Sequence, residues 1–341
     1  MERQSGTVWI GLLSFAACSP TVIDASESGG QSSGGGGGVQ TTGSGQGGCV
    51  DICTANPPST AECVEGRCLV TLALDPGAFT LAIDATHVYW TTYDGRLMKV
   101  PIDGGEMTTL AVGDGGPARV AVDATHAYWT SGNALVKVPI EGGDAITLAS
   151  APRTPIDVAV DATNVYWAVR SGPEYGGLIT KLPIAGGDSV VLASGEIDPA
   201  SIIVDATTLY WADLLGFVRS VGIAGGQPVT LVSGQAVPYD IATDGTSIFW
   251  TNEQGGTVNK VSIGGGNPIT LATGQAIAET IALDDTTVYW TNFEYGLMKM
   301  PSAGGRPTEV VAGQDHPYGV AIDASSIYWR NSTGIMKLSP R

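Results

Sequence analysis

The chain has 341 residues, of which 43% are hydrophobic and 14% are charged, and its formal net charge is −17. This length and apolar content allow one large globular domain with small appendages and exclude a wholly disordered chain. The acidity reflects 33 Asp and Glu against 16 Lys and Arg. Nucleic acid and anionic lipid surfaces are therefore poor partners, and none is expected.

The N-terminus has the features of an export signal. Arg3 precedes an apolar run over residues 8–17 that is too short to span a bilayer as a helix. The run leads to Cys18 in a sequence that resembles the lipobox of bacterial lipoproteins, although Phe15 stands where that pattern prefers Leu. The resemblance implies that residues 1–18 are a signal peptide, with Cys18 lipidated at the outer membrane or cell surface. A periplasmic product of ordinary cleavage and an uncleaved anchor are the alternatives.

A tether and a cysteine cluster follow. Residues 19–48 are almost all Gly, Ser, Thr and Gln with a few acids, a composition that predicts disorder. The next cysteines are Cys49, Cys53, Cys63 and Cys68. An even number in an exported chain predicts two disulfides, here in a minidomain over residues 49–68. Of three pairings we favour 49 with 63 and 53 with 68, because Cys49 and Cys53 are too close for an easy bridge. Zinc is the rival, disfavoured by the spacing and the oxidising compartment.

From Leu69 onward the chain repeats one pattern: an Asp, a short polar turn, an apolar residue, an aromatic residue and Trp. The tryptophans are Trp90, Trp129, Trp167, Trp211, Trp250, Trp290 and Trp329. Their spacings of 39, 38, 44, 39, 40 and 39 residues are typical of a repeat architecture. Each unit predicts four strands, a to d: an apolar strand ending in the Asp, the aromatic strand, a Lys-bearing strand and a Thr-Leu strand. No helix is expected after the signal.

The turns predict how the repeats close. Strands a to c occur seven times, but the Gly-Gly turn between c and d occurs six times, because the chain ends at Arg341 where the seventh would fall. A spare d-like strand from Leu69 to Leu72 precedes the first repeat. The sequence therefore predicts an all-β, seven-bladed β-propeller over residues 69–341, with four-stranded blades and a closing blade that combines residues 318–338 with residues 69–73.

The repeat also carries a family resemblance. Val-Ala-Val-Asp followed by Tyr-Trp-Thr, with a Gly turn downstream, resembles the YWTD or LDL-receptor class B β-propeller repeat and its bacterial relatives. The family's Thr is matched by Thr91, Thr130, Thr251 and Thr291, while Asp213 alone keeps its final Asp. That family usually has six blades, so six or eight blades are the alternatives to the seven copies counted here.

Differences in length between the repeats indicate which parts of a blade are structural and which could form a binding surface. Repeats differ in length only between the Trp and the Lys position, which is the b–c connection. In an up-and-down blade the b–c and d–a connections share one face, here called the loop face, and the a–b and c–d turns share the opposite turn face. The repeated Asp and Lys could form a ring of ligands. A residue present in every copy is better explained as structural, with the Asp bonded in its turn and the Lys lying between blades.

Aromatic residues outside the repeated pairs gather in the loop-face connections. Tyr and Arg are the residues that contact surfaces concentrate. The candidate binding residues are Tyr93, Arg170, Glu174, Tyr175, Tyr239, Phe293, Tyr295, Tyr318 and Arg330. Tyr239 and Tyr318 share with Phe79 the position five before the repeated Asp, where they could instead cap the central channel.

No dinucleotide fingerprint, P-loop, HExxH or EF-hand loop occurs, so no catalytic residue or resident cofactor is assigned. We expect a monomeric, non-enzymatic envelope lipoprotein that binds a protein or glycan through the loop face. One alternative is a structural envelope component. Another is a hydrolase or lyase at the channel mouth, resembling propeller lactonases or streptogramin lyases, with Asp157, Asp240 and Glu279 holding Ca²⁺ or Mg²⁺. His316 falls on the loop face and the other two histidines on the turn face, so a histidine cluster is not expected.

Overall fold

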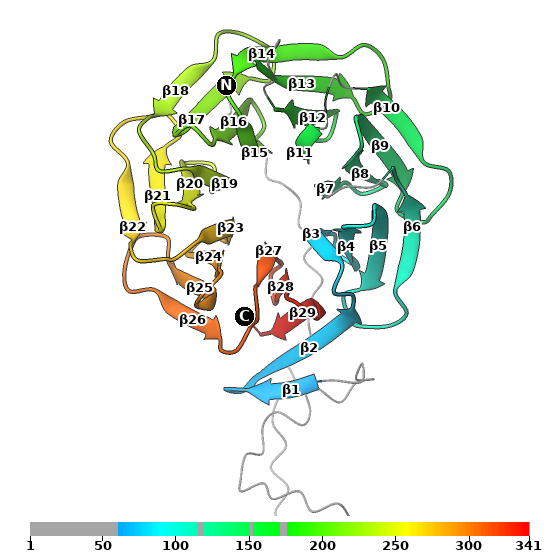
Figure 1. The fold of residues 1–341 in the computed structure, drawn as a ribbon, viewed down its shortest axis with the longest axis vertical. Coiled ribbons are helices and arrows are strands. Elements are labelled where there is room, and N and C mark those ends of the chain that lie inside the picture. Colours follow the sequence, from blue (N-terminus) through cyan, green and yellow to red (C-terminus); the bar gives the residue numbers. More distant parts are fainter. Residues whose placement is uncertain (1–60, 115–118, 151–152, 154, 171–175, 341) are drawn as a thin grey trace, which may run out of the picture. The chain divides into compact units, whose positions relative to one another are not determined.

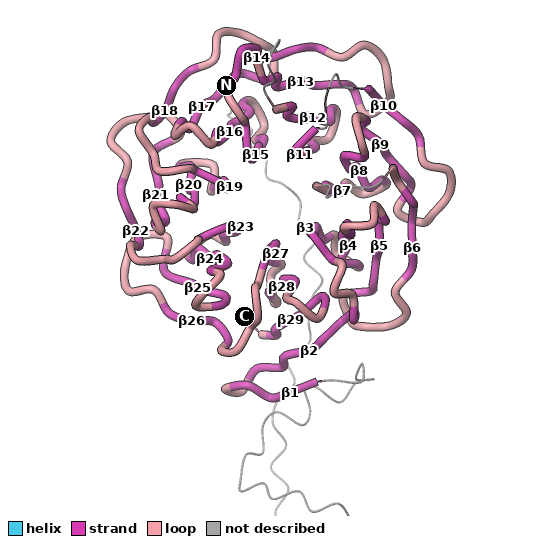
Figure 2. Tube along the Cα trace, in the orientation of Figure 1, coloured by secondary structure: helices cyan, strands magenta, loops and turns pink. Residues whose placement is uncertain are grey.

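The computed structural model describes residues 61–114, 119–150, 153, 155–170 and 176–340. These residues form seven antiparallel sheets arranged as the blades of a propeller (Figure 1). Six sheets have four strands and one has five, and the strands are joined by loops alone (Figure 2). The predictions of an all-β fold, of seven blades and of four-stranded blades are confirmed.

The first four blades follow one another along the chain. Blade 1 contains β3 (Ala78–Ile83), β4 (His87–Thr92), β5 (Arg96–Pro101) and β6 (Thr108–Val112). Blade 2 contains β7 (Val120–Val122), β8 (His126–Ser131), β9 (Ala134–Pro139) and β10 (Ile146–Ser150). Blade 3 contains β11 (Pro155–Val160), β12 (Asn164–Val169), β13 (Gly177–Pro183) and β14 (Val190–Glu196). Blade 4 contains β15 (Pro199–Val204), β16 (Thr208–Asp213), β17 (Phe217–Gly222) and β18 (Val229–Val232).

The last three blades complete the ring. Blade 5 contains β19 (Pro238–Thr243), β20 (Ser247–Asn252), β21 (Thr257–Ser262) and β22 (Ile269–Ala272). Blade 6 contains β23 (Ala278–Leu283), β24 (Thr287–Asn292), β25 (Gly296–Pro301) and β26 (Thr308–Val311). Blade 7 contains β27 (Tyr318–Ile322), β28 (Ile327–Arg330), β29 (Gly334–Ser339), β2 (Arg67–Leu74) and β1 (Ala61–Val64).

Paired aromatics hold neighbouring blades together. Successive residues of a strand point to opposite faces of its sheet, so the Tyr and the Trp of each pair enter different interfaces. Tyr89 of blade 1 packs in one cluster with Trp129 of blade 2, and Tyr328 of blade 7 packs with Trp90 of blade 1. Seven such clusters fill the interfaces. Burying about 200 Å² of one Trp contributes at most about 5 kcal/mol, and only a neighbouring blade can supply that burial.

The repeated Asp organises the turn from the first to the second strand of each blade. Asp84 Oδ1 accepts the backbone N–H groups of Thr86 at 2.6 Å and His87 at 2.7 Å, and Oδ2 accepts the Tyr89 hydroxyl at 2.6 Å. Burial raises the pKa of Asp84, but these hydrogen bonds outweigh it and the net pKa is lowered. The structural interpretation of this Asp is confirmed.

The repeated Lys ties a blade to the next one at five of the seven blades. Lys99 Nζ donates to the carbonyl oxygen of Ile140 in blade 2 at 2.6 Å. Lys337 makes the same bond across the closure, to the carbonyl oxygen of Ile102 in blade 1 at 2.8 Å. The side chain therefore crosses the gap between blades, as its structural interpretation predicts.

The early strand closes the ring. Strand β2 pairs with β29, with Leu69 opposite Leu338 and Leu74 opposite Gly334 (Figure 1, blue beside red). Arg67 Nη2 also donates to the carbonyl oxygen of Val310 in blade 6 at 2.6 Å. The predicted closure is confirmed.

Strand β1 is an addition that the sequence did not indicate. It pairs with β2 and makes blade 7 five-stranded, so residues 61–68, which we expected in a separate minidomain, continue the closing blade. Cys68 is disulfide-bonded, whereas Cys18, Cys49 and Cys53 lie outside the described residues. The disulfide pairing therefore stays a prediction. In the part of the chain that the structure describes, no helix is long and apolar enough to cross a membrane.

Candidate binding site at the channel mouth

The innermost strands of the seven blades surround the central axis of the propeller (Figure 1), and the loop-face end of this axis is here called the channel mouth. One position on these strands, four before each repeated Asp, lies near their loop-face ends. Its residues are Thr80, Arg119, Asp157, Ser201, Asp240, Thr280 and Gly319. Most are polar in strands that are otherwise apolar, so they form a polar ring at the mouth of the channel.

Asp240 joins four blades within this ring. Its Oδ1 accepts the Ser201 hydroxyl of blade 4 at 2.6 Å, and its Oδ2 accepts the Ile281 N–H of blade 6 at 2.9 Å. Arg119 Nη1, contributed by blade 2, lies 3.8 Å from Oδ1. Asp240 itself is 8% exposed. A buried carboxylate that accepts two hydrogen bonds and lies near a cation is well compensated, which stabilises the ring across the channel.

Asp157 is the second buried carboxylate of the ring. Its Oδ2 accepts the Ile202 N–H of blade 4 and its Oδ1 accepts the Val158 N–H, both at 2.8 Å. Burial raises the pKa of Asp157 to about 6 against the opposing charge of Arg119. The oxygens of both carboxylates thus already accept protein donors, which disfavours them as metal ligands. Among the described residues, no group of three or more His, Cys, Asp or Glu side chains is placed to hold a metal ion.

An aromatic cap covers the ring. The Tyr318 ring stacks on Phe79 with centroids 5.5 Å apart, and its hydroxyl lies 3.2 Å from that of Tyr239. Arg119 Nη2 donates to the Tyr318 hydroxyl at 3.5 Å, and the Arg330 guanidinium lies 4.9 Å from the centroid of the Tyr318 ring. Tyr318 is 4% exposed, so it is a buried cap of the channel instead of an exposed contact residue. Tyr239 is half-buried beside it.

An aromatic rim stands outside the cap. Tyr93, Phe293 and Tyr295 are 52%, 44% and 49% exposed. Tyr93 contacts Phe79 with centroids 5.2 Å apart, and Phe293 meets His316 edge-on at 4.2 Å. These three residues, here called the rim, have the exposure that a contact surface requires. Arg170 is also exposed, while Glu174 and Tyr175 lie outside the described residues.

Large apolar side chains are exposed mainly in two places on the described part of the chain. The loop-face connections expose Tyr93, Ile197, Leu215, Ile277, Phe293 and Tyr295. The outer strands expose Leu74, Val112, Ile146, Val190, Val191, Val229 and Ile269. The turn-face connections expose Met107 alone among described residues of this kind. Of the two faces, the loop face therefore carries the apolar exposure.

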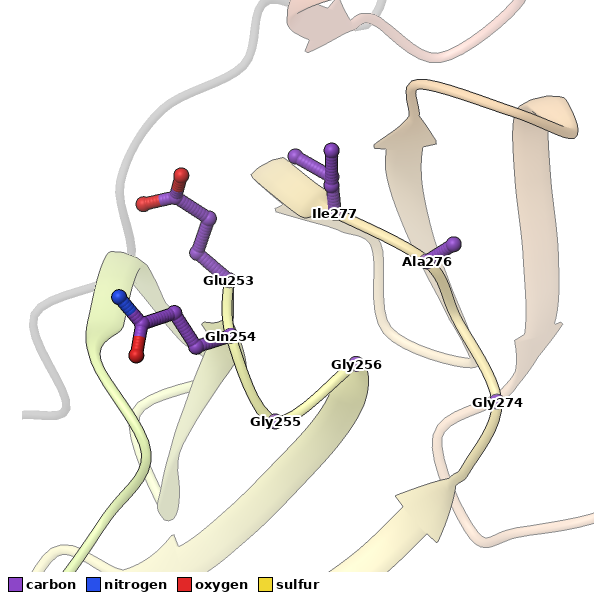
Figure 3. Close-up of a pocket in the computed structure, with 7 residues that line it drawn as sticks. All are labelled: Glu253, Gln254, Gly255, Gly256, Gly274, Ala276 and Ile277. Atoms are coloured by element: carbon purple, nitrogen blue, oxygen red, sulfur yellow. The ribbon is translucent and has the colours of Figure 1, made fainter.

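Two residues of opposite charge, Glu279 in β23 and Arg330 in β28, lie at the loop-face ends of their strands. Burial raises the pKa of Glu279 to about 7; the charge of Arg330 opposes the rise and that of Glu253 adds to it. Glu253 also lines a shallow open cavity of about 520 Å³ between two loops of blades 5 and 6 (Figure 3). Residues 253–256 form one side of this cavity, and Gly274, Ala276 and Ile277 form the other.

No protein-family model matches the chain, and no curated protein matches it in sequence. Solved structures of other proteins are similar to this chain in fold. A virginiamycin B lyase from Staphylococcus aureus has a TM-score of 0.67 at 12% identity, covering 80% of this chain and 98% of that chain. A nidogen/laminin complex has a TM-score of 0.54 at 16% identity, covering 75% and 98%. The WD40 propeller domain of Doa1 has a TM-score of 0.64 at 12% identity, covering 79% and 94%.

The likeness shows the fold. The chain is a β-propeller. At such identities the shared architecture does not carry the substrates or partners of these proteins over to this chain.

Arg119 is the residue of the mouth that sequence reasoning missed. It occupies the same position relative to the repeated Asp as Asp157 and Asp240. The available signal was a polar side chain recurring at one register position of an apolar strand. The meeting of Arg119 with Asp240 was not accessible, because the two residues lie three blades apart in the chain.

Proposed function

We propose that this chain is a non-enzymatic, exported envelope lipoprotein whose propeller binds a protein or glycan through the loop face. The observation that carries the proposal is the set of exposed aromatic and apolar side chains in the loop-face connections. Exposed apolar groups gathered on one face mark interaction sites, and Tyr is concentrated at contact surfaces. A similar propeller in a nidogen/laminin complex supports the use of this fold for protein binding.

Replacing the three rim residues with Ala (Tyr93→Ala, Phe293→Ala, Tyr295→Ala) should weaken binding and leave the melting temperature nearly unchanged. Each aromatic anchor is worth on the order of 1–3 kcal/mol of binding free energy, whereas an exposed side chain contributes little to folding. The measurement is capture of envelope proteins, identified by mass spectrometry, together with binding to a glycan array.

The matched control replaces three equally exposed outer-strand residues, Ile146→Ala, Val190→Ala and Ile269→Ala. These side chains are 53%, 49% and 55% exposed, so the control removes similar apolar surface from another region. Capture that survives the rim substitutions and is lost in the control would place the contact surface on the outer strands and contradict the proposal.

The envelope address rests on the N-terminal sequence, with Cys18 as the lipidated residue and two disulfides within residues 49–68. Cys18→Ser should move the protein from the membrane fraction to the soluble exported fraction, because the only proposed anchor is its lipid. Alkylation of the released protein without reductant should label none of Cys49, Cys53, Cys63 and Cys68. Retention in the membrane would refute the lipid anchor, and two or more labelled cysteines would support zinc instead.

A lyase or hydrolase at the channel mouth is the second candidate. Glu279 favours it, because a carboxyl group whose burial raises the pKa to about 7 can act as a general base at neutral pH. A similar structure is a virginiamycin B lyase, so that antibiotic is the first substrate to try. Turnover by the native protein that is lost in Glu279→Gln would replace the binding proposal with this one.

A further inference from the structure

Arg330 is an unusual residue at the channel mouth. It occupies the position directly after the repeated Trp, where the other blades have Thr or Ala. It lies at the end of β28, opposite Tyr318 in the strand register, and Gly319 follows Tyr318 where the other blades carry a side chain of the polar ring. The large cationic side chain thus takes a position that the repeat reserves for a small one.

The guanidinium of Arg330 has no acceptor among the described residues. It is half-buried, and its Nε is buried without a hydrogen-bond partner. None of the ion pairs or hydrogen bonds of the described residues includes it, and its Cζ lies 4.9 Å from the centroid of the Tyr318 ring. A partly buried charge without a hydrogen-bonding partner is unfavourable. The other arginine of the mouth differs, because Arg119 lies 3.8 Å from a carboxylate oxygen of Asp240.

Glu279 does not supply the missing acceptor. Its charge acts on Arg330 at a distance, yet the two side chains form no ion pair in the described structure. Glu279 is half-buried, and the charged groups that act on it come from four other segments of the chain. They are Arg330, Glu253, Arg119 and His316. A carboxyl group in this setting can be neutral, and a neutral carboxyl group can donate a hydrogen bond.

We propose that Arg330 and Glu279 form a site for the carboxylate of a small organic acid, inside the aromatic rim of the loop face. This inference rests on the proposed function, because it assigns a ligand chemistry to the same face. Guanidinium binds carboxylate through paired N–H donors, and a protonated Glu279 adds a further donor. The rim supplies apolar contact for the rest of the ligand, as binding pockets commonly do.

The site predicts a direction of pH dependence. Burial raises the pKa of Glu279 to about 7, so the group is mostly protonated at pH 6 and mostly ionised at pH 8. An ionised Glu279 repels a carboxylate, whereas a protonated one donates to it. Affinity for the ligand should therefore be higher at pH 6 than at pH 8.

The test is a ligand-observed NMR titration of the full chain with matched small molecules. Galacturonate and N-acetylleucine each carry one free carboxylate, on a sugar and on an amino acid, and galactose and N-acetylleucinamide are their neutral counterparts. At least one acid should bind at least tenfold more tightly than its neutral counterpart at pH 6 and lose several-fold affinity at pH 8. The acid that binds identifies the source of the carboxylate. Equal binding of acid and neutral forms in both pairs would overturn the proposal.

Variants assign the effect to residues. Arg330→Met should abolish the preference for the acid, while Arg153→Met, which removes the same charge from an exposed position in another loop-face connection, should preserve it. Glu279→Gln should bind the acid equally at both pH values. His316→Asn should keep the pH dependence, because His316 is not a ligand in this site. A pH dependence that survives in Glu279→Gln and disappears in His316→Asn would overturn the role of Glu279.

Folding and the wider proposal are separated by two further readouts. Arg330→Met should melt no lower than the native protein, because Arg330 has no acceptor to lose among the described residues; a clear drop in melting temperature would show a structural role and contradict the site. If the native protein binds none of the acids but still captures its partner through the rim, this inference alone is rejected. If partner capture is unchanged by the rim substitutions, the proposed function is rejected, whether or not the acid binds.

Discussion

A chain that begins at Asp75 is expected to unfold or aggregate at temperatures where the full propeller is stable. Such a chain lacks β1 and β2, so β29 becomes an unpaired edge and the interface of blade 7 with its neighbours opens. Leu69 and Leu72, 7% and 5% exposed, are removed from two core clusters. Losing a buried Leu destabilises a fold by about 2–5 kcal/mol, and domains are stable by only about 5–15 kcal/mol.

The measurement is thermal and urea unfolding followed by circular dichroism, with size-exclusion chromatography for aggregation. A chain that begins at Gly48 serves as the control, because it removes the preceding segment and keeps both strands. Equal melting temperatures for the two chains would show that β2 does not close the ring and would refute this topology.

Asp240→Ala is expected to lower the free energy of unfolding by about 3–5 kcal/mol, the range found when one partner of a buried charge pair is removed. The substitution leaves the Ser201 hydroxyl and the Ile281 N–H without their acceptor, and it takes from Arg119 its nearest anion. Because these three partners of Asp240 come from blades 4, 6 and 2, the loss acts on the whole ring. Urea unfolding at pH 7 measures the change.

Two variants make this prediction specific. Asp285→Ala removes an exposed Asp from a turn and should change stability by less than about 0.5 kcal/mol. Adding Arg119→Met to Asp240→Ala should recover part of the lost stability, because the unpaired cation is then absent and the pair is coupled. A double variant as unstable as the sum of both single variants would show that Arg119 and Asp240 act independently.

The repeated architecture was accessible from the sequence alone. The tryptophan spacing predicted seven blades, and the count of Gly-Gly turns predicted that the strand beginning at Leu69 completes the last one. The structural roles of the repeated Asp, bonded in its turn, and of the repeated Lys, lying between blades, followed as well, because both residues recur at fixed separations. An interaction that recurs in every blade requires the same residue types at the same spacing, so it is visible as a periodic pattern in the sequence.

The channel mouth was decided by the tertiary structure. Arg119 meets Asp240 across three blades, and Arg330 covers Tyr318; such contacts depend on the number of blades and the curvature of the ring. The burial of Tyr318 was likewise not predictable from the repeat, because Tyr318 occupies the same repeat position as Tyr239, which is half-buried. Strand β1 pairs only because β2 presents an edge. The sequence determined what each blade is and where the ring closes, whereas side chains that converge on the axis from separate blades acquire partners only when the ring is formed.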